Sequence, residues 1–158
     1  MEKHNVVAVV RVRGLTGVSA DARETLKLLG LTRVNHCVLV RGTPQSKGMI
    51  ERVKDFVTWG EPTPAMVATL VEHCGRLAGD KRLTGALLKA AGFDSFEAFA
   101  AKLLSGEATA ASVPGMKKVF RLSPPRKGYR SVKRAYPAGA LGNRGAEMDG
   151  LLKRMARG

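Results

Sequence analysis

The most chemically distinctive stretch of the chain is a run of cationic side chains that begins at Lys117 and ends at Arg134. It holds eight Lys or Arg in eighteen residues and no Asp or Glu. Such charges repel one another until a polyanion arrives, and nucleic acid is the simplest polyanion for a folded domain to hold this way. We therefore predict that eight cations neutralise phosphates: Lys117, Lys118, Arg121, Arg126, Lys127, Arg130, Lys133 and Arg134.

Three features of this stretch and of the residues just after it favour a binding arm over a merely solvated tail, which is the alternative that charge alone leaves open. Residues 119–122 have the composition of a short strand, and Pro124-Pro125 fixes the direction of the chain. Tyr129 and Tyr136 are aromatic side chains that we expect to stack on bases or riboses.

Arginines outside the arm extend the predicted basic surface onto the body of the protein. Arg11 and Arg13 have the same parity at the end of an apolar strand, and Arg41 ends a second strand. Ordinary charge at strand ends explains these three arginines equally well.

Patterns that would indicate nucleotide hydrolysis or zinc binding are incomplete. In residues 42–48 the lysine precedes the glycine, and Pro44 removes an N–H that a phosphate-binding loop needs. The pairs His36-Cys37 and His73-Cys74 are adjacent, without the spacer of about two to four residues that lets one turn present two ligands. We expect no metal site and no cofactor.

The sequence also contains no convincing pair of side chains for general acid–base catalysis. Glu51 and Asp55 are four residues apart, but Arg52 and Lys54 lie between them, which is typical of a solvated helix face. Neither serine nor cysteine comes with a recognisable base. The sequence predicts no catalysis and no small-molecule substrate.

The charge is concentrated at the C-terminal end. The chain has 158 residues and a net charge of +14, of which +10 lies after residue 115. Two cysteines cannot form a disulfide framework, which favours a reduced, cytoplasmic protein. The apolar run 6–10 is too short for a signal-peptide core or a membrane span.

The elements that must position these side chains form an α/β (α+β) class fold. Residues 1–62 are expected to form a small β-α-β-α-β sandwich with strands at 6–12, 37–41 and 56–59. The first of these strands is nearly continuous in β-branched residues, which predicts a central strand that is buried on both faces. One helix is expected between Ser19 and Gly30, and a second begins at Thr43-Pro44 or only at Gly48.

Residues 63–113 predict an electrically neutral helical insert with five bases and five acids. Its helices begin at Thr63-Pro64, at Leu83 and at a capping box of Asp94 with Glu97. In the third segment, 114–158, residues 119–122 return to the sheet as an edge strand, and the basic arm follows. Residues 137–145 then read as a loop, before an amphipathic turn at 148–155.

Four segments resemble the L-thirty family of large-subunit ribosomal proteins, in its longer archaeal type, which is related to eukaryotic L-seven. They are residues 26–36, 47–57, 59–62 and 120–128. The resemblance covers nearly the whole chain, and it implies some similarity to ferredoxin-like folds. It also implies a structural role, without catalysis, in which a returning strand and tail bind large-subunit ribosomal RNA beside neighbouring ribosomal proteins.

By this resemblance the RNA-binding role is carried over to Lys47-Gly48-Met49 and to Arg126, Lys127 and Gly128.

Three other classes of protein remain open. They are a free-standing protein that compacts DNA or RNA, an enzyme that uses the arm to clamp RNA, and an adaptor whose helices recruit another protein.

Overall fold

The structure, a computed structural model of the chain, describes residues 6–14 and 16–156. Its five strands are β1 (Val6–Arg11), β2 (His36–Arg41), β3 (Val57–Gly60), β4 (Val119–Arg121) and β5 (Gly142–Gly145). Its α-helices are α1 (Ala20–Leu29), α2 (Pro44–Arg52), α3 (Pro64–Cys74), α4 (Gly85–Ala90), α5 (Phe96–Ser105) and α6 (Met148–Met155). Short 3-10 turns are η1 (Ala78–Asp80) and η2 (Ala110–Ser112).

The strands form one mixed sheet in the order β4-β2-β1-β3-β5, with β1 in the middle. β1 is antiparallel to β2 and β3, β4 is antiparallel to β2, and β5 is parallel to β3. The central position of β1 confirms the prediction from its nearly continuous β-branched sequence. The mixed sheet with helices on it confirms the α+β class.

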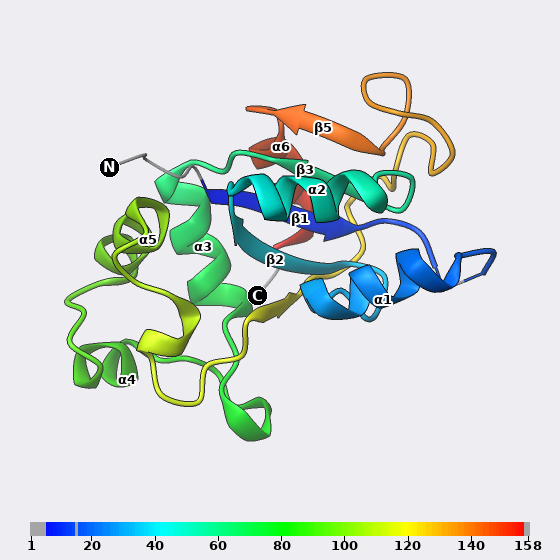
Figure 1. Cartoon of the computed structure of the whole chain (residues 1–158). Helices are drawn as coiled ribbons and strands as arrows, with labels where there is room; N and C mark the ends of the chain where they lie inside the picture. Colours follow the sequence, from blue (N-terminus) through cyan, green and yellow to red (C-terminus); the bar gives the residue numbers. More distant parts are fainter. Residues whose placement is uncertain (1–5, 15, 157–158) are drawn as a thin grey trace.

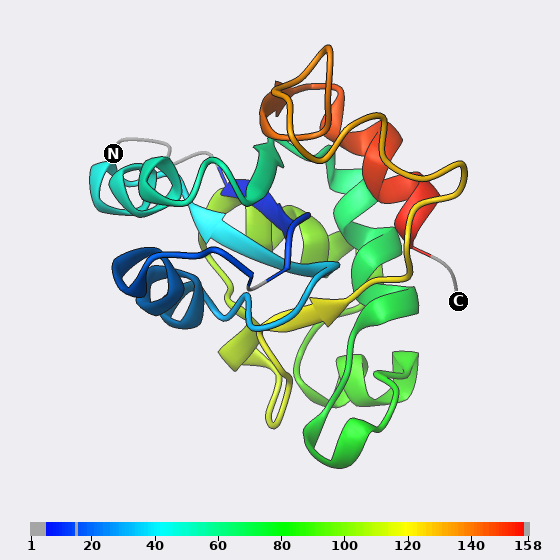
Figure 2. The ribbon, with the colours of Figure 1, turned by 90° about the vertical axis from the view of Figure 1, so that its right-hand side faces the viewer.

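Helices cover both faces of the sheet, so that the molecule has three layers (Figure 2). On one face, α1 and α2 bury side chains such as Leu26 and Ile50 against Val9 and Val38. On the other face, α3, α5 and α6 form a larger core that includes Phe99 and the β1 residues Ala8 and Val10. Of the helices in residues 63–113, α5 therefore packs on the central strand, and α3 packs on α5 and on β4.

Capping residues set several helix ends. The Thr43 side chain accepts a hydrogen bond from the backbone N–H of Ser46, so α2 begins at Pro44 and not at Gly48. The N-cap of α5 is Ser95, whose hydroxyl accepts from the N–H of Ala98, and the expected cap at Asp94 is wrong by one residue.

The third segment folds more completely than its composition suggests. The predicted edge strand is present as β4, and the predicted C-terminal turn is the helix α6, whose Leu151 and Leu152 are buried. The prediction of a loop over residues 137–145 is wrong in its last part, because Gly142–Gly145 pairs with β3 as β5.

Candidate nucleic-acid interface

The segment of residues 123–141, which we call the basic loop, arches beyond the end of the sheet at which β1 ends (orange in Figure 1). Backbone contacts attach its start to α6. The N–H of Ser123 donates to the carbonyl of Met155 (3.2 Å) and that of Arg126 to the carbonyl of Arg154 (3.3 Å). The Arg154 guanidinium in turn donates to the carbonyls of Arg126 and Gly128, at 3.2 and 3.3 Å. The helix therefore fixes the path of the loop.

Tyr129 anchors the middle of the basic loop to the protein. Its hydroxyl donates to Oδ1 of Asn35 (2.8 Å), and its ring packs against the small core of Val12, Ala140 and Leu141. Burial raises the pKa of this phenol to about 12. The structure thus gives Tyr129 a packing and hydrogen-bonding role, whereas its stacking on bases stays a prediction.

Replacing Tyr129 with phenylalanine is expected to lower the free energy of unfolding by about 0.5–1.5 kcal/mol, because the ring still packs but the hydrogen bond to Asn35 is lost. Chemical denaturation measures this change. Tyr136→Phe is the matched control, since no hydrogen bond of the Tyr136 hydroxyl is found among the described residues. Unchanged stability with weakened RNA binding in Tyr129→Phe would instead support stacking.

Five cations project from the basic loop into solvent. Their side chains are exposed, and within residues 6–14 and 16–156 no acidic side chain forms an ion pair with any of them. Arg130 donates to the carbonyl of Pro137 (3.2 Å), which holds its guanidinium against the loop. The five are Arg126, Lys127, Arg130, Lys133 and Arg134.

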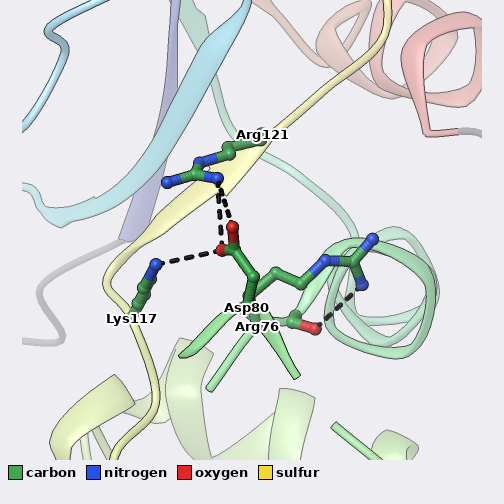
Figure 3. Close-up of polar contacts among 5 residues, drawn as sticks. Arg76, Asp80, Lys117 and Arg121 are labelled. Atoms are coloured by element: carbon green, nitrogen blue, oxygen red, sulfur yellow. Dashed lines mark hydrogen bonds and ion pairs between the residues drawn. The ribbon is translucent and has the colours of Figure 1, made fainter. Parts of the chain in front are cut away.

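Lys117 and Arg121 lie before the basic loop and share one carboxylate (Figure 3). The Lys117 ammonium is 3.0 Å from Oδ1 of Asp80, and the Arg121 guanidinium is 3.0 Å from Oδ2. The hydrogen bond from Lys117 and the charge of Arg121 hold the pKa of the Asp80 carboxyl below its usual value. In the RNA-free protein these two cations are therefore partly neutralised, a pairing between distant segments that the sequence did not indicate.

The predicted contact of Arg11 with nucleic acid is wrong, because this side chain lies in the core with 1% of its surface exposed. Its guanidinium donates to the backbone carbonyls of Arg13 (2.9 Å) and Leu31 (2.8 Å). Burial lowers the pKa of Arg11 from its ordinary value. Arg13 remains near the surface, with its guanidinium 5.6 Å from the centre of the Phe56 ring.

Arg41 and Lys47 are at the other end of the sheet. Arg41 pairs with Val6 at the start of β1, whereas Arg11 ends β1 and pairs with Val57. The antiparallel order thus separates Arg41 from Arg13, contrary to the expected common surface. Lys47 is exposed in α2, whose N-terminus follows β2 directly.

Arg144 and Arg154 support the basic loop, although no periodic pattern or motif marks either residue in the sequence. The Arg144 guanidinium donates to Thr58 Oγ1 (2.9 Å) and to the carbonyl of Ala140 (3.2 Å). It also lies 5.1 Å from the centre of the Tyr136 ring, so one cation already faces that ring. Burial lowers the pKa of Arg144.

His36 begins β2 and pairs with Arg121 of the edge strand β4. Burial lowers the pKa of its imidazole below the ordinary value of 6.5, and the charges of Arg121, Arg33 and Arg11 lower it further. A backbone hydrogen bond at Gly30 opposes this shift only in part. The Nδ1 atom is buried and has no hydrogen-bond partner among the described residues.

We expect the melting temperature to fall as the pH decreases below about 6.5. In that range the unfolded chain binds a proton at His36 that the folded protein excludes, so acid favours unfolding. Thermal unfolding at about pH 7.5, 6.5 and 5.5 measures this, and His36→Gln should show a flatter dependence. An identical slope in the variant would contradict the role of His36.

No group of three or more His, Cys, Asp or Glu that could hold a metal occurs among the described residues. Cys37 and Cys74 are free and buried, and burial raises the pKa of both thiols. In the described part of the chain, each helix is too short or too polar to cross a bilayer.

Comparison with known proteins identifies the family of the chain. The family model described as Ribosomal protein L30p/L7e matches residues 7–57. The large ribosomal subunit protein uL30 of Methanocorpusculum labreanum is 47% identical over 150 residues, which are 94% of this chain and 98% of that protein. The uL30 proteins of Methanoregula boonei and Archaeoglobus fulgidus are 44% and 42% identical, with the same coverage of both chains. The chain therefore belongs to the L30p/L7e family of ribosomal proteins, as the four sequence segments indicated.

Proposed function

We propose that this chain is a structural constituent of the large ribosomal subunit in the cytoplasm, and that it binds and stabilises large-subunit ribosomal RNA through the basic loop. Membership of the uL30 family supports the assignment to the large subunit. The observation that carries the assignment of the surface is the set of five exposed cations on one loop, none of which forms an ion pair with a described residue. The role is architectural and not enzymatic.

The main phosphate contacts in this proposal come from the basic loop. Phosphate contacts fix the position of a protein on RNA without reading its sequence, and the shape of the folded RNA supplies specificity. Attachment of the loop to α6 and to Asn35 reduces the ordering that binding would otherwise require. The loop cations proposed to contact phosphates are Arg126, Lys127, Arg130, Lys133 and Arg134.

Other cations have secondary places in the proposal. Arg13 is near the same end of the sheet and extends the surface of the loop. Lys117 and Arg121 leave their shared carboxylate, Asp80, and bind a phosphate of the RNA in its place. Lys47 is at the opposite end of the sheet and would contact a separate segment of RNA. Neighbouring ribosomal proteins are further partners, whereas no membrane or small-molecule substrate is involved.

Sedimentation of cell extract through sucrose, with detection of this chain at low and high salt, tests the proposal. Migration with the large subunit that resists moderate salt is the expected result. Migration at the top of the gradient, or with bulk DNA, would contradict it and favour a compaction protein or an enzyme that acts on RNA.

A further inference from the structure

A groove opens at one edge of the sheet, between the two helical layers. It has a volume of about 380 Å³ and mostly apolar walls. α1 and α2 contribute Leu28 and Met49 to one wall, and Leu103, Ala108 and Met116 form part of the other. The Leu28 side chain is 72% exposed, although most leucines of this protein are buried. The groove is apart from the basic loop.

The floor of the groove is the part of the β2 edge that no strand of the described chain pairs with. β4 pairs with β2 only from His36 to Val38, whereas β2 continues to Arg41. Beyond Val38, β2 pairs with β1 on one side, and no strand of the described chain lies on its other side. Such an edge presents backbone N–H and C=O groups that an added strand can pair with.

The two walls suit the alternating side chains of a strand. Along this edge, Val38 and Val40 pack with the core under α1 and α2, and Leu39 packs with the core on the other face. A strand added beside β2 would direct successive side chains to the same two sides. Apolar residues on such a strand would therefore meet apolar walls on both faces of the sheet.

The charge of the groove distinguishes between the molecules that could bind in it. Arg41 and Lys118 are its only charged lining residues among those described, and both are exposed. A second copy of this chain would bring another Arg41 and a net charge of +14 to the same edge, which opposes self-pairing. RNA would complement the two cations but would leave the apolar walls without apolar contacts.

We propose that the edge of β2 at Leu39–Arg41 binds an extended, acidic peptide segment of another protein, which joins the sheet as an additional strand. In this mode, backbone hydrogen bonds provide affinity, the groove walls select β-branched or other apolar side chains, and Arg41 and Lys118 select Asp or Glu. That this other protein is a ribosomal neighbour of the chain rests on the proposed function. The extended and acidic character of the peptide does not, because it follows from the groove itself.

An array of synthetic heptapeptides tests the proposal with the purified full chain. Valine or threonine occupies alternate positions, and Asp, Lys or Pro occupies one of the positions between them. We expect the chain to bind the Asp peptides about two- to fivefold more tightly than the Lys peptides, as solvent-exposed ion pairs do. Proline should abolish binding because it removes a backbone N–H. NMR titration of the best Asp peptide should shift the amides of residues 39–41.

Two substitutions in the groove and one control substitution outside it test the site. Leu28→Glu should weaken binding of the Asp peptide, because it removes an apolar contact and adds a repelling charge, while its exposed position protects the fold. Leu87→Glu is the matched control, since Leu87 is 44% exposed and lies on α4, outside the groove. Lys118→Glu should shift the preference from Asp toward Lys peptides.

Each contrary outcome overturns the proposal in a different way. Absence of saturable binding would remove the peptide site, and equal binding of the Asp, Lys and Pro peptides would remove the strand mechanism. Concentration-dependent dimers that Leu28→Glu abolishes would make a second copy the occupant. None of these results changes the expected migration with the large subunit, so failure here is distinguishable from failure of the proposed function.

Discussion

Replacing Arg126, Lys133 and Arg134 together with glutamine is expected to weaken binding of the full chain to large-subunit ribosomal RNA by about 10- to 100-fold near physiological salt. These side chains are exposed and have no hydrogen bond or ion pair to the described protein. Their loss should therefore remove phosphate contacts without disturbing the fold. Binding measured over a salt series should give a slope of log K against log salt of roughly −4 to −5 for the native chain, reduced by about 2–3 in the variant.

The matched control removes the same number of charges from the helical layer. Lys81, Arg82 and Lys89 are exposed cations in the nearly neutral segment 63–113, and their replacement with glutamine should change the affinity and the slope little. Equal losses in the two variants would mean that net charge, and not the basic loop, determines binding. A large decrease in melting temperature of the loop variant would also contradict the account.

Replacing Phe99 with alanine is expected to lower the free energy of unfolding by about 3–5 kcal/mol, which corresponds to a decrease in melting temperature of about 6–20 °C. Phe99 is fully buried on α5, with its ring 4.6 Å from that of Phe93 in an edge-to-face contact. It shares a core with Ala8 and Val10 of the central strand. The cavity left by the ring would therefore open between the helices and the sheet.

Phe96→Ala, on the same helix, is the control, and it should cost less because Phe96 is only half-buried. Unfolding followed by far-ultraviolet circular dichroism and by Trp59 fluorescence should shift by the same amount in Phe99→Ala. If the circular dichroism transition moved and the Trp59 transition did not, the helices would unfold independently of the sheet.

Local signals in the sequence were sufficient for most of the fold. The β-branched run in residues 6–12 identified the central strand, and Thr43-Pro44 and Thr63-Pro64 marked two helix starts whose caps the structure shows. These features depend on contacts within a few residues, so a single sequence records them. The cap of α5 was misplaced because Asp94 and Ser95 are both suitable N-cap residues.

The candidate surface was harder to predict because it depends on distant contacts. The prediction grouped Arg11 with Arg41, but strand pairing places them at opposite ends of the sheet. Backbone carbonyls accept the buried Arg11 guanidinium, and no sequence pattern marks such acceptors. Asp80 is 37 residues from Lys117 along the chain, so its pairing with that side chain becomes visible only in the fold.

Ultraviolet crosslinking of the protein to RNA within purified large subunits, followed by mass spectrometry of the crosslinked peptides, tests the central claim most directly. The account predicts that the principal RNA-linked peptides come from residues 126–134, with weaker crosslinks near Arg13 and Lys47. Crosslinks confined to α3, α4 and α5, with none in the basic loop, would contradict it.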